Sequence, residues 1–148
     1  GYHGWHDWYL STNLRNSNNL NTHLLPNVNT IGIPKNFKNQ SYGFKFNDIK
    51  EFKKIIQKNK LAAVIMEVSR LKETKKSFLK EIRKITKKKN ICLIYDECTS
   101  GFRETYGGLY KKYGVTPDIV VYGKSIANGY PLCAIVGKKN IMEILCQF

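Results

Sequence analysis

Three short runs of apolar residues limit the fold of this chain more than any other feature of its sequence. They cover residues 61–66, 91–95 and 119–122, and each is far shorter than the roughly 18 residues that a membrane span requires. A helical pattern at residues 77–88 separates the first two runs, with Phe78, Ile82 and Ile85 on one face. Strands that are apolar throughout are typical of a parallel sheet. We therefore predict a right-handed crossover made of strand 61–68, helix 77–88 and strand 91–95.

The remaining elements follow from turn residues and periodicity. Asn47 or Asp48 can cap a helix that ends near Asn59. An apolar stretch at 133–136 follows strand 119–122 too soon for a helical crossover, so we predict that it is antiparallel. Short helices are expected before Tyr113 and over residues 140–146. Residues 11–41 predict a long surface excursion with little regular structure. The fold class is thus α/β, with a mostly parallel sheet and one antiparallel strand.

The size and charge of the chain narrow the possible functions. It has 148 residues, 42% of them hydrophobic, which is enough for the core of one domain. It begins at Gly1 and ends inside a helical pattern, so we expect an internal fragment of a longer protein. The formal net charge of +14 leaves open a basic nucleic-acid-binding module. Because few of the cations are arginines and the lysines are widely spread, a solvated basic face is the favoured interpretation.

The cysteines indicate a reducing environment. Cys92, Cys98, Cys133 and Cys146 lie in or beside apolar runs and show no C-x-x-C spacing. Such residues usually behave as small buried hydrophobic side chains. A cytoplasmic protein with free thiols is the simplest explanation. An H-x-x-H-D string at residues 3–7 lacks further spaced ligands, so we predict no metal site there.

Polar residues follow each of the three predicted strands. Glu67 follows the first apolar run, Asp96 and Glu97 follow the second, and Lys124 follows the third after a glycine. Ligand sites of open parallel sheets lie beyond the carboxyl ends of the strands, so we expect these groups to share one edge. Desolvation at that edge would favour the neutral, nucleophilic amine that Schiff-base chemistry needs. The residues alone leave open a purely structural ion pair between Asp96 and Lys124.

Four strings carry a resemblance to a known family. They are YHGWHD at residues 2–7, LIYDECTSGFR at 93–103, YGGLYKKYGVTPDIV at 106–120 and YGKSIANGYPLCAIVGKKNIM at 122–142. Over essentially its whole length the chain resembles class-III aminotransferases, especially the glutamate-1-semialdehyde aminomutase-like branch. The resemblance implies a pyridoxal-phosphate (PLP) enzyme of fold type I that is usually a homodimer. Residues 1–148 would form the central part of its PLP-binding large domain.

The resemblance also implies roles for individual residues. Lys124 would form the internal aldimine with PLP and later move protons. Asp96 would pair with the pyridinium nitrogen, which keeps the ring protonated so that it can accept electrons. Tyr2 would stack on one face of the ring, with His3 and Gly4 completing the turn beside it.

Several positions depart from the family pattern. Cys98 stands where relatives usually carry a valine that packs on the other ring face, and Thr99 is expected to contact the ring hydroxyl. Glu67, a possible substrate contact, is followed by Val68 rather than the common proline. We therefore expect a class-III aminotransferase with a small-molecule amino donor and acceptor, and glutamate-1-semialdehyde 2,1-aminomutase is the alternative. The phosphate-binding turn and the partner-subunit residue of the family fall outside the chain, so we do not expect catalysis by these residues alone.

Overall fold

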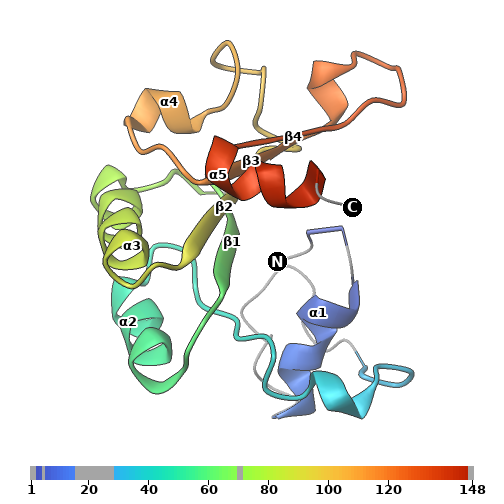
Figure 1. Cartoon of the computed structure of the whole chain (residues 1–148), viewed down its shortest axis with the longest axis vertical. Coiled ribbons are helices and arrows are strands. Elements are labelled where there is room, and N and C mark those ends of the chain that lie inside the picture. The colour runs from blue at the N-terminus through green and yellow to red at the C-terminus, as the bar shows by residue number, and fades with distance from the viewer. Residues whose placement is uncertain (1–2, 5, 16–28, 70–71, 147–148) are drawn as a thin grey trace. The chain divides into compact units, whose positions relative to one another are not determined.

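The computed structural model describes residues 3–4, 6–15, 29–69 and 72–146 (Figure 1). The chain divides into two compact units, Gly1–Asn59 and Lys60–Phe148. The first unit contains helices and connecting segments, and the second contains the sheet. Among the described residues, no helix is both long enough and apolar enough to cross a bilayer.

The longest element of the first unit is helix α2 (Ile49–Lys58), which confirms the helix predicted after Asp48. The Asp48 carboxylate accepts a hydrogen bond from the backbone N–H of Glu51 at 2.9 Å, and the Glu51 carboxylate accepts one from the N–H of Lys45 at 2.6 Å. The first bond satisfies an N–H group that the start of a helix would otherwise leave unpaired, and the second holds the segment that precedes the helix. Helix α2 ends at Lys58, and the side-chain amide of the C-cap residue Asn59 donates to the carbonyl of Ile55 at 2.8 Å.

The start of the predicted surface excursion is more ordered and more buried than expected. Helix α1 (His6–Leu10) leads directly into the 3-10 helix η1 (Ser11–Leu14), whose residues Ser11, Thr12 and Asn13 are buried. Ser11 shows why a short polar side chain can be buried here, because its hydroxyl donates to the backbone carbonyl of Trp8 at 2.9 Å. A second 3-10 helix, η2, covers Lys35–Phe37. Residues 16–28 of the excursion lie outside the described residues.

The second unit is built on a sheet with the predicted topology. Its described strands are β1 (Ala63–Glu67), β2 (Cys92–Asp96), β3 (Ile119–Tyr122) and β4 (Ala134–Gly137), and they lie side by side in that order (Figure 1). Strands β1, β2 and β3 are parallel, and β4 is antiparallel to β3. Helix α3 (Lys76–Lys88) connects β1 to β2. The mostly parallel sheet with one antiparallel strand is confirmed.

The core of this unit lies between α3 and the sheet. Leu79 and Ile82 of α3 and Leu93 and Tyr95 of β2 are fully buried. Helix α3 therefore presents an apolar face at helical spacing, as predicted, while its lysines remain on the other side.

The outer strands are less covered than continuous apolar runs would suggest. In β1 the exposed Ala63 and Ile65 alternate with the buried Val64 and Met66. Ile135 and Val136 of β4 expose more than half of their surface. The described elements thus cover the central strands more completely than the outer ones.

Short helices complete the second unit, and their positions agree with those predicted from the sequence. Helix α4 (Tyr110–Tyr113) ends at Gly114, which adopts a left-handed conformation with φ 64°, as helix C-termini commonly require. Helix α5 (Lys139–Met142) continues into the 3-10 helix η4 (Glu143–Cys146). These two elements together occupy the region predicted as a helix at residues 140–146.

Candidate active site

The parallel strands bring the predicted site residues to one edge of the sheet. Glu67 and Asp96 are the last residues of β1 and β2, and they are direct partners in the strand register. Val121 of β3 pairs with Asp96 and lies three positions before Lys124. The carboxyl ends of parallel strands point the same way. The same edge of the sheet therefore carries Glu67, Asp96 and Lys124.

Lys124 leaves the sheet in an unusual backbone conformation. Gly123 is extended, and the chain then turns into the short 3-10 helix η3 (Lys124–Ile126). Lys124 has a positive φ of 50°, which is uncommon for a residue with a side chain and tends to occur at functional positions. The turn carries the Lys124 side chain out of the sheet and leaves the residue exposed. The desolvated amine expected from the sequence is therefore not observed in this chain.

A neutral hydroxyl holds the amine of Lys124. Its Nζ donates to Oγ1 of Thr99 at 3.0 Å. The structural ion pair between Asp96 and Lys124 that the sequence left open stays a prediction. The amine remains available to a ligand at this edge.

A tight turn after β2 gathers the other site residues. Asp96 is only 9% exposed, and its Oδ1 accepts a hydrogen bond from the backbone N–H of Cys98 at 3.0 Å. This is an Asx turn, in which the carboxylate bonds to the backbone two residues further along. The turn places the Cys98 sulfur 3.3 Å from the point where a Cβ on Gly123 would lie. Residues 96–99 and 123–124 thus form one small constellation.

Glu97 belongs to a different environment from its neighbour Asp96. Its side chain is fully buried, its Oε1 accepts from the backbone N–H of Tyr110 at 2.9 Å, and its Oε2 accepts a hydrogen bond from the Ser100 hydroxyl. Burial raises the pKa of Glu97, although these hydrogen bonds oppose the change. Sequence reasoning grouped the two acids together, whereas the alternation of side chains along a strand would have separated them.

The other predicted site residues lie at the end of β1, in the first unit or outside the described residues. Glu67 is half-buried at the end of β1. His3 is half-buried and Gly4 is exposed with a positive φ of 100°, and both belong to the first unit. Tyr2 lies outside the described residues. The structure therefore brings Asp96, Cys98, Thr99 and Lys124 together. The cofactor and substrate roles of all the predicted site residues stay predictions.

A second charged cluster lies away from this edge and has a structural role. The Asp118 carboxylate accepts hydrogen bonds from Arg83 at 2.6 and 3.1 Å and from the backbone N–H of Leu93 at 2.9 Å, and it pairs with Lys138 at 2.6 Å. Burial alone would raise the pKa of Asp118, but these partners outweigh burial and lower it to about 2. The cluster ties α3, β2 and the end of β4 to the residue that precedes β3.

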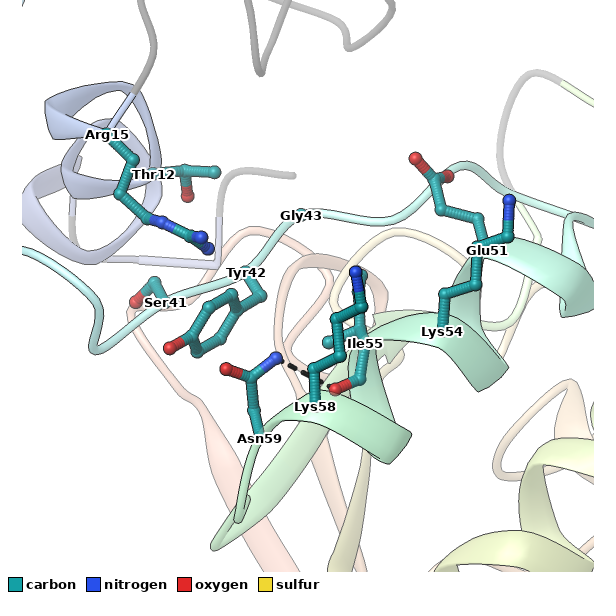
Figure 2. A pocket seen from close by; sticks show the side chains of 10 residues that line it. All are labelled: Thr12, Arg15, Ser41, Tyr42, Gly43, Glu51, Lys54, Ile55, Lys58 and Asn59. Carbon is teal, nitrogen blue, oxygen red and sulfur yellow. Dashed lines mark hydrogen bonds between the residues drawn. The ribbon is translucent and has the colours of Figure 1, made fainter.

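The first unit contains a polar cavity of about 300 Å³, which Figure 2 shows from close by. Lys54 and Lys58 reach it from α2, and the Arg15 guanidinium lies over the ring of Tyr42 at 5.0 Å from the ring centre. Glu51 also lines it, but its carboxylate already binds the backbone near the start of α2. None of the predicted site residues lines this cavity.

Comparison with known proteins assigns the whole chain to a family. The family model for class-III aminotransferases matches residues 1–147. Glutamate-1-semialdehyde 2,1-aminomutase of Archaeoglobus fulgidus is 38% identical over 146 residues, which cover 96% of this chain and 34% of that protein. The 3-aminobutyryl-CoA aminotransferase of Cloacimonas acidaminovorans is 34% identical over 155 residues, with 99% of this chain and 33% of that protein covered. The chain thus spans about a third of the length of these relatives.

Solved structures agree with the sequence relatives. An omega-transaminase from Sphaerobacter thermophilus superposes with a TM-score of 0.79 at 30% identity and covers 95% of this chain and 34% of its own. The PLP internal aldimine form of the FumI protein of Sphingopyxis sp. MTA144 gives the same TM-score at 21% identity and supports the fold. The chain therefore belongs to the class-III aminotransferase family, whose members depend on PLP.

Proposed function

We propose that the protein carrying this chain is a PLP-dependent aminotransferase of class III, which transfers an amino group between a small-molecule donor and acceptor. The observation that carries this proposal is the common edge of β2 and β3, where a buried carboxylate, Asp96, and an accessible amine, Lys124, follow neighbouring parallel strands. Family membership supports the same reaction class. Residues 1–148 are proposed to be the central part of the PLP-binding large domain.

The residues at this edge fit PLP chemically. Lys124 offers a primary amine that can bond to an aldehyde, and Asp96 offers a carboxylate suited to a protonated ring nitrogen. Gly123 lacks the side chain that would crowd the Cys98 sulfur, which leaves room between the two strand ends. When bound, PLP withdraws electrons from the carbon that carries the amino group and so makes its proton acidic.

Each residue of the constellation has a separate task in this proposal. Lys124 would hold the cofactor and, once its amine is free, carry a proton to and from the substrate carbon. Thr99 holds that amine at 3.0 Å and limits the positions it can take. The backbone N–H of Cys98 fixes the Asp96 carboxylate, which would orient the ring. Tyr2, His3 and Gly4 are proposed to contact the cofactor, and Glu67 is proposed to contact the substrate.

Chemical labelling tests the assignment of the lysine. The complete polypeptide that carries this chain is loaded with PLP, reduced with borohydride, digested and mapped by mass spectrometry. We expect the pyridoxyl group on Lys124. Lys138 and Lys139 serve as internal controls, because they are exposed lysines that follow the next strand, β4. A label on either of them in place of Lys124 would show that the proposed site is wrong.

Glutamate-1-semialdehyde 2,1-aminomutase activity is a second candidate, favoured by relatives such as the Archaeoglobus protein and the 40% identical Methanobrevibacter smithii protein. An aminomutase keeps the amino group on one carbon skeleton, so it needs no external acceptor. The complete polypeptide would then isomerise glutamate 1-semialdehyde without any second substrate. Amino transfer that occurs only when a 2-oxo acid is added would support the aminotransferase instead.

We also propose a homodimeric, cytoplasmic enzyme. The free thiols of Cys92, Cys98 and Cys133 support a reducing compartment. The exposed Ile135 and Val136 of β4 and the exposed Tyr130 give this chain apolar surface for contact with other protein segments. Sedimentation analysis of the complete polypeptide tests the dimer, and a purely monomeric, active enzyme would contradict it.

A further inference from the structure

The polar cavity of the first unit collects positive charge from two separate elements. All of the residues that line it belong to this unit. Lys54 and Lys58 come from α2, and Arg15 directly follows the 3-10 helix η1 (Figure 2). The cavity has a volume of about 300 Å³, which lies at the lower end of the range of small-molecule sites. It therefore has the size for a small ligand and the charge for an anionic one.

The positive charge of the cavity is not balanced from within. Of the described residues that line it, Glu51 is the single acid, and its carboxylate already accepts a hydrogen bond from the backbone N–H of Lys45 at 2.6 Å. Three cations against one carboxylate leave a surplus of two positive charges. Lys54 and Lys58 are four residues apart on one helix, and like charges at this spacing repel each other. An anion bound in the cavity would reduce this repulsion.

The Arg15 side chain is held in an orientation that suits an oxyanion. Its guanidinium carbon lies 5.0 Å from the centre of the Tyr42 ring. A guanidinium over an aromatic ring keeps N–H groups at its edge free to donate, and such a pair of N–H groups matches the oxygens of a phosphate or carboxylate. The hydroxyls of Ser41 and Tyr42 add neutral donors to the lining. Ile55 is the only aliphatic side chain among the described lining residues, so the cavity favours a hydrophilic ligand.

We propose that this cavity binds a phosphomonoester of a small polar molecule, and that Arg15 and Lys58 bind its phosphate group. A phosphate dianion matches the surplus of two positive charges. Its oxygens also point in several directions, which suits donors that approach from two elements, whereas the two oxygens of a carboxylate lie in one plane. This inference does not depend on the proposed aminotransferase function, because none of the residues assigned to PLP lines the cavity.

Calorimetry tests the class of ligand. The complete polypeptide is loaded with PLP, desalted and titrated with glycerol 3-phosphate at fixed ionic strength. Loading with PLP first keeps the probe from competing for the cofactor site. We expect one binding site per chain and weaker binding of succinate, a dicarboxylate, at the same ionic strength. Succinate binding as tightly as glycerol 3-phosphate would overturn the assignment to phosphate, and no binding of either probe would overturn the site.

Two variants of the cavity and one matched control locate the bound probe. Lys58→Gln and Arg15→Gln each remove one charge-assisted contact, so each should raise the Kd of glycerol 3-phosphate about tenfold, which corresponds to about 1.4 kcal/mol. The control is Lys50→Gln, because Lys50 is an exposed lysine of the same helix that does not line the cavity. It removes the same charge from the chain and should leave the Kd almost unchanged. Equal losses in all three variants, or no loss in any, would show that the net charge alone attracts the probe and would refute the proposal.

Folding and cofactor binding are checked separately from the cavity. Far-UV circular dichroism and the stoichiometry of bound PLP should match the parent in all three variants, because Arg15, Lys50 and Lys58 are exposed. If Arg15→Gln disturbs the fold through loss of its contact with Tyr42, Lys58→Gln decides the test, because the Lys58 ammonium forms no ion pair within the described residues. An unchanged Kd in a folded Lys58→Gln protein then refutes the proposal, while the borohydride label on Lys124 still reports on the proposed function independently.

Discussion

Replacing the buried Asp118 by asparagine should cost more stability than neutralising an exposed charge such as Glu104. The carboxylate binds Arg83, Lys138 and the backbone N–H of Leu93, and only 8% of its side chain is exposed. Lowering its pKa from 3.8 to about 2 corresponds to about 2 kcal/mol in favour of the charged form. Asparagine resembles the protonated acid in shape and charge, so Asp118→Asn should lower the free energy of unfolding near neutral pH by about 2 kcal/mol.

The pH dependence follows from the direction of this change. The pKa of Asp118 is lower in the folded state than in the unfolded chain, so its contribution is fully present above about pH 4. The contribution is lost as the pH falls from about 4 towards 2, because the folded state then takes up the proton that the unfolded state already holds. The parent and Asp118→Asn should therefore differ most near pH 7 and converge at the acidic end of this window.

Urea unfolding, followed by far-UV circular dichroism, measures this difference. The measurement is made at pH 7 and in steps down to the lowest pH at which the protein folds. Glu104→Gln is the matched control, because Glu104 pairs with Lys112 at 2.9 Å while both side chains are more than half exposed. Exposed pairs contribute little to stability, so the control should behave like the parent. The reasoning is refuted if Asp118→Asn matches Glu104→Gln at pH 7, or if its difference from the parent does not shrink on acidification.

Three further substitutions and one hydrodynamic measurement test other features. Asp96→Asn should still bind PLP in the complete polypeptide but lose most of its turnover, and steady-state kinetics at the parental rate would contradict the assigned ring contact. Asp48→Ala should destabilise the protein by about 1 kcal/mol through loss of the α2 cap, measured by urea unfolding. Gly101→Ala should cost about 1–3 kcal/mol in the same assay, because its Cβ would lie 2.7 Å from the Tyr122 ring. The 148 residues expressed alone should associate through the exposed strand β4, and a clean monomer in size-exclusion chromatography would contradict this.

The fold was predictable where a local pattern determines the structure. Strand β3 has the predicted bounds, and the antiparallel direction of β4 followed from the short connection before it. Burial was less predictable, because it depends on which elements lie over each strand. Ile65 and Ile135 are apolar yet exposed, and Ser11 is polar yet buried. The type of a residue indicates its preference for burial or exposure, but it does not indicate which other elements cover that residue in the fold.

The sequence predicted which residues lie at the site, but it did not predict the contacts between them. The position of Asp96 and Lys124 after neighbouring strands follows from parallel topology. The hydrogen bond between Thr99 and Lys124 depends on a turn with a positive φ at the lysine, which no residue-type preference would indicate. The burial of Glu97 likewise depends on a loop that returns from Tyr110 to meet its carboxylate.

The order of the strands has a consequence for how the sheet can assemble during synthesis. The described strands lie in the order β1, β2, β3, β4, which is also the order in which a ribosome makes them. Each new strand can therefore dock on the one made just before it, and none has to be inserted between two strands that are already paired. Among the described strands, the most recently made strand is always an edge of the growing sheet. In β4 this edge carries the exposed Ile135 and Val136, so a nascent chain at this stage presents an adhesive apolar strand until later protein covers it.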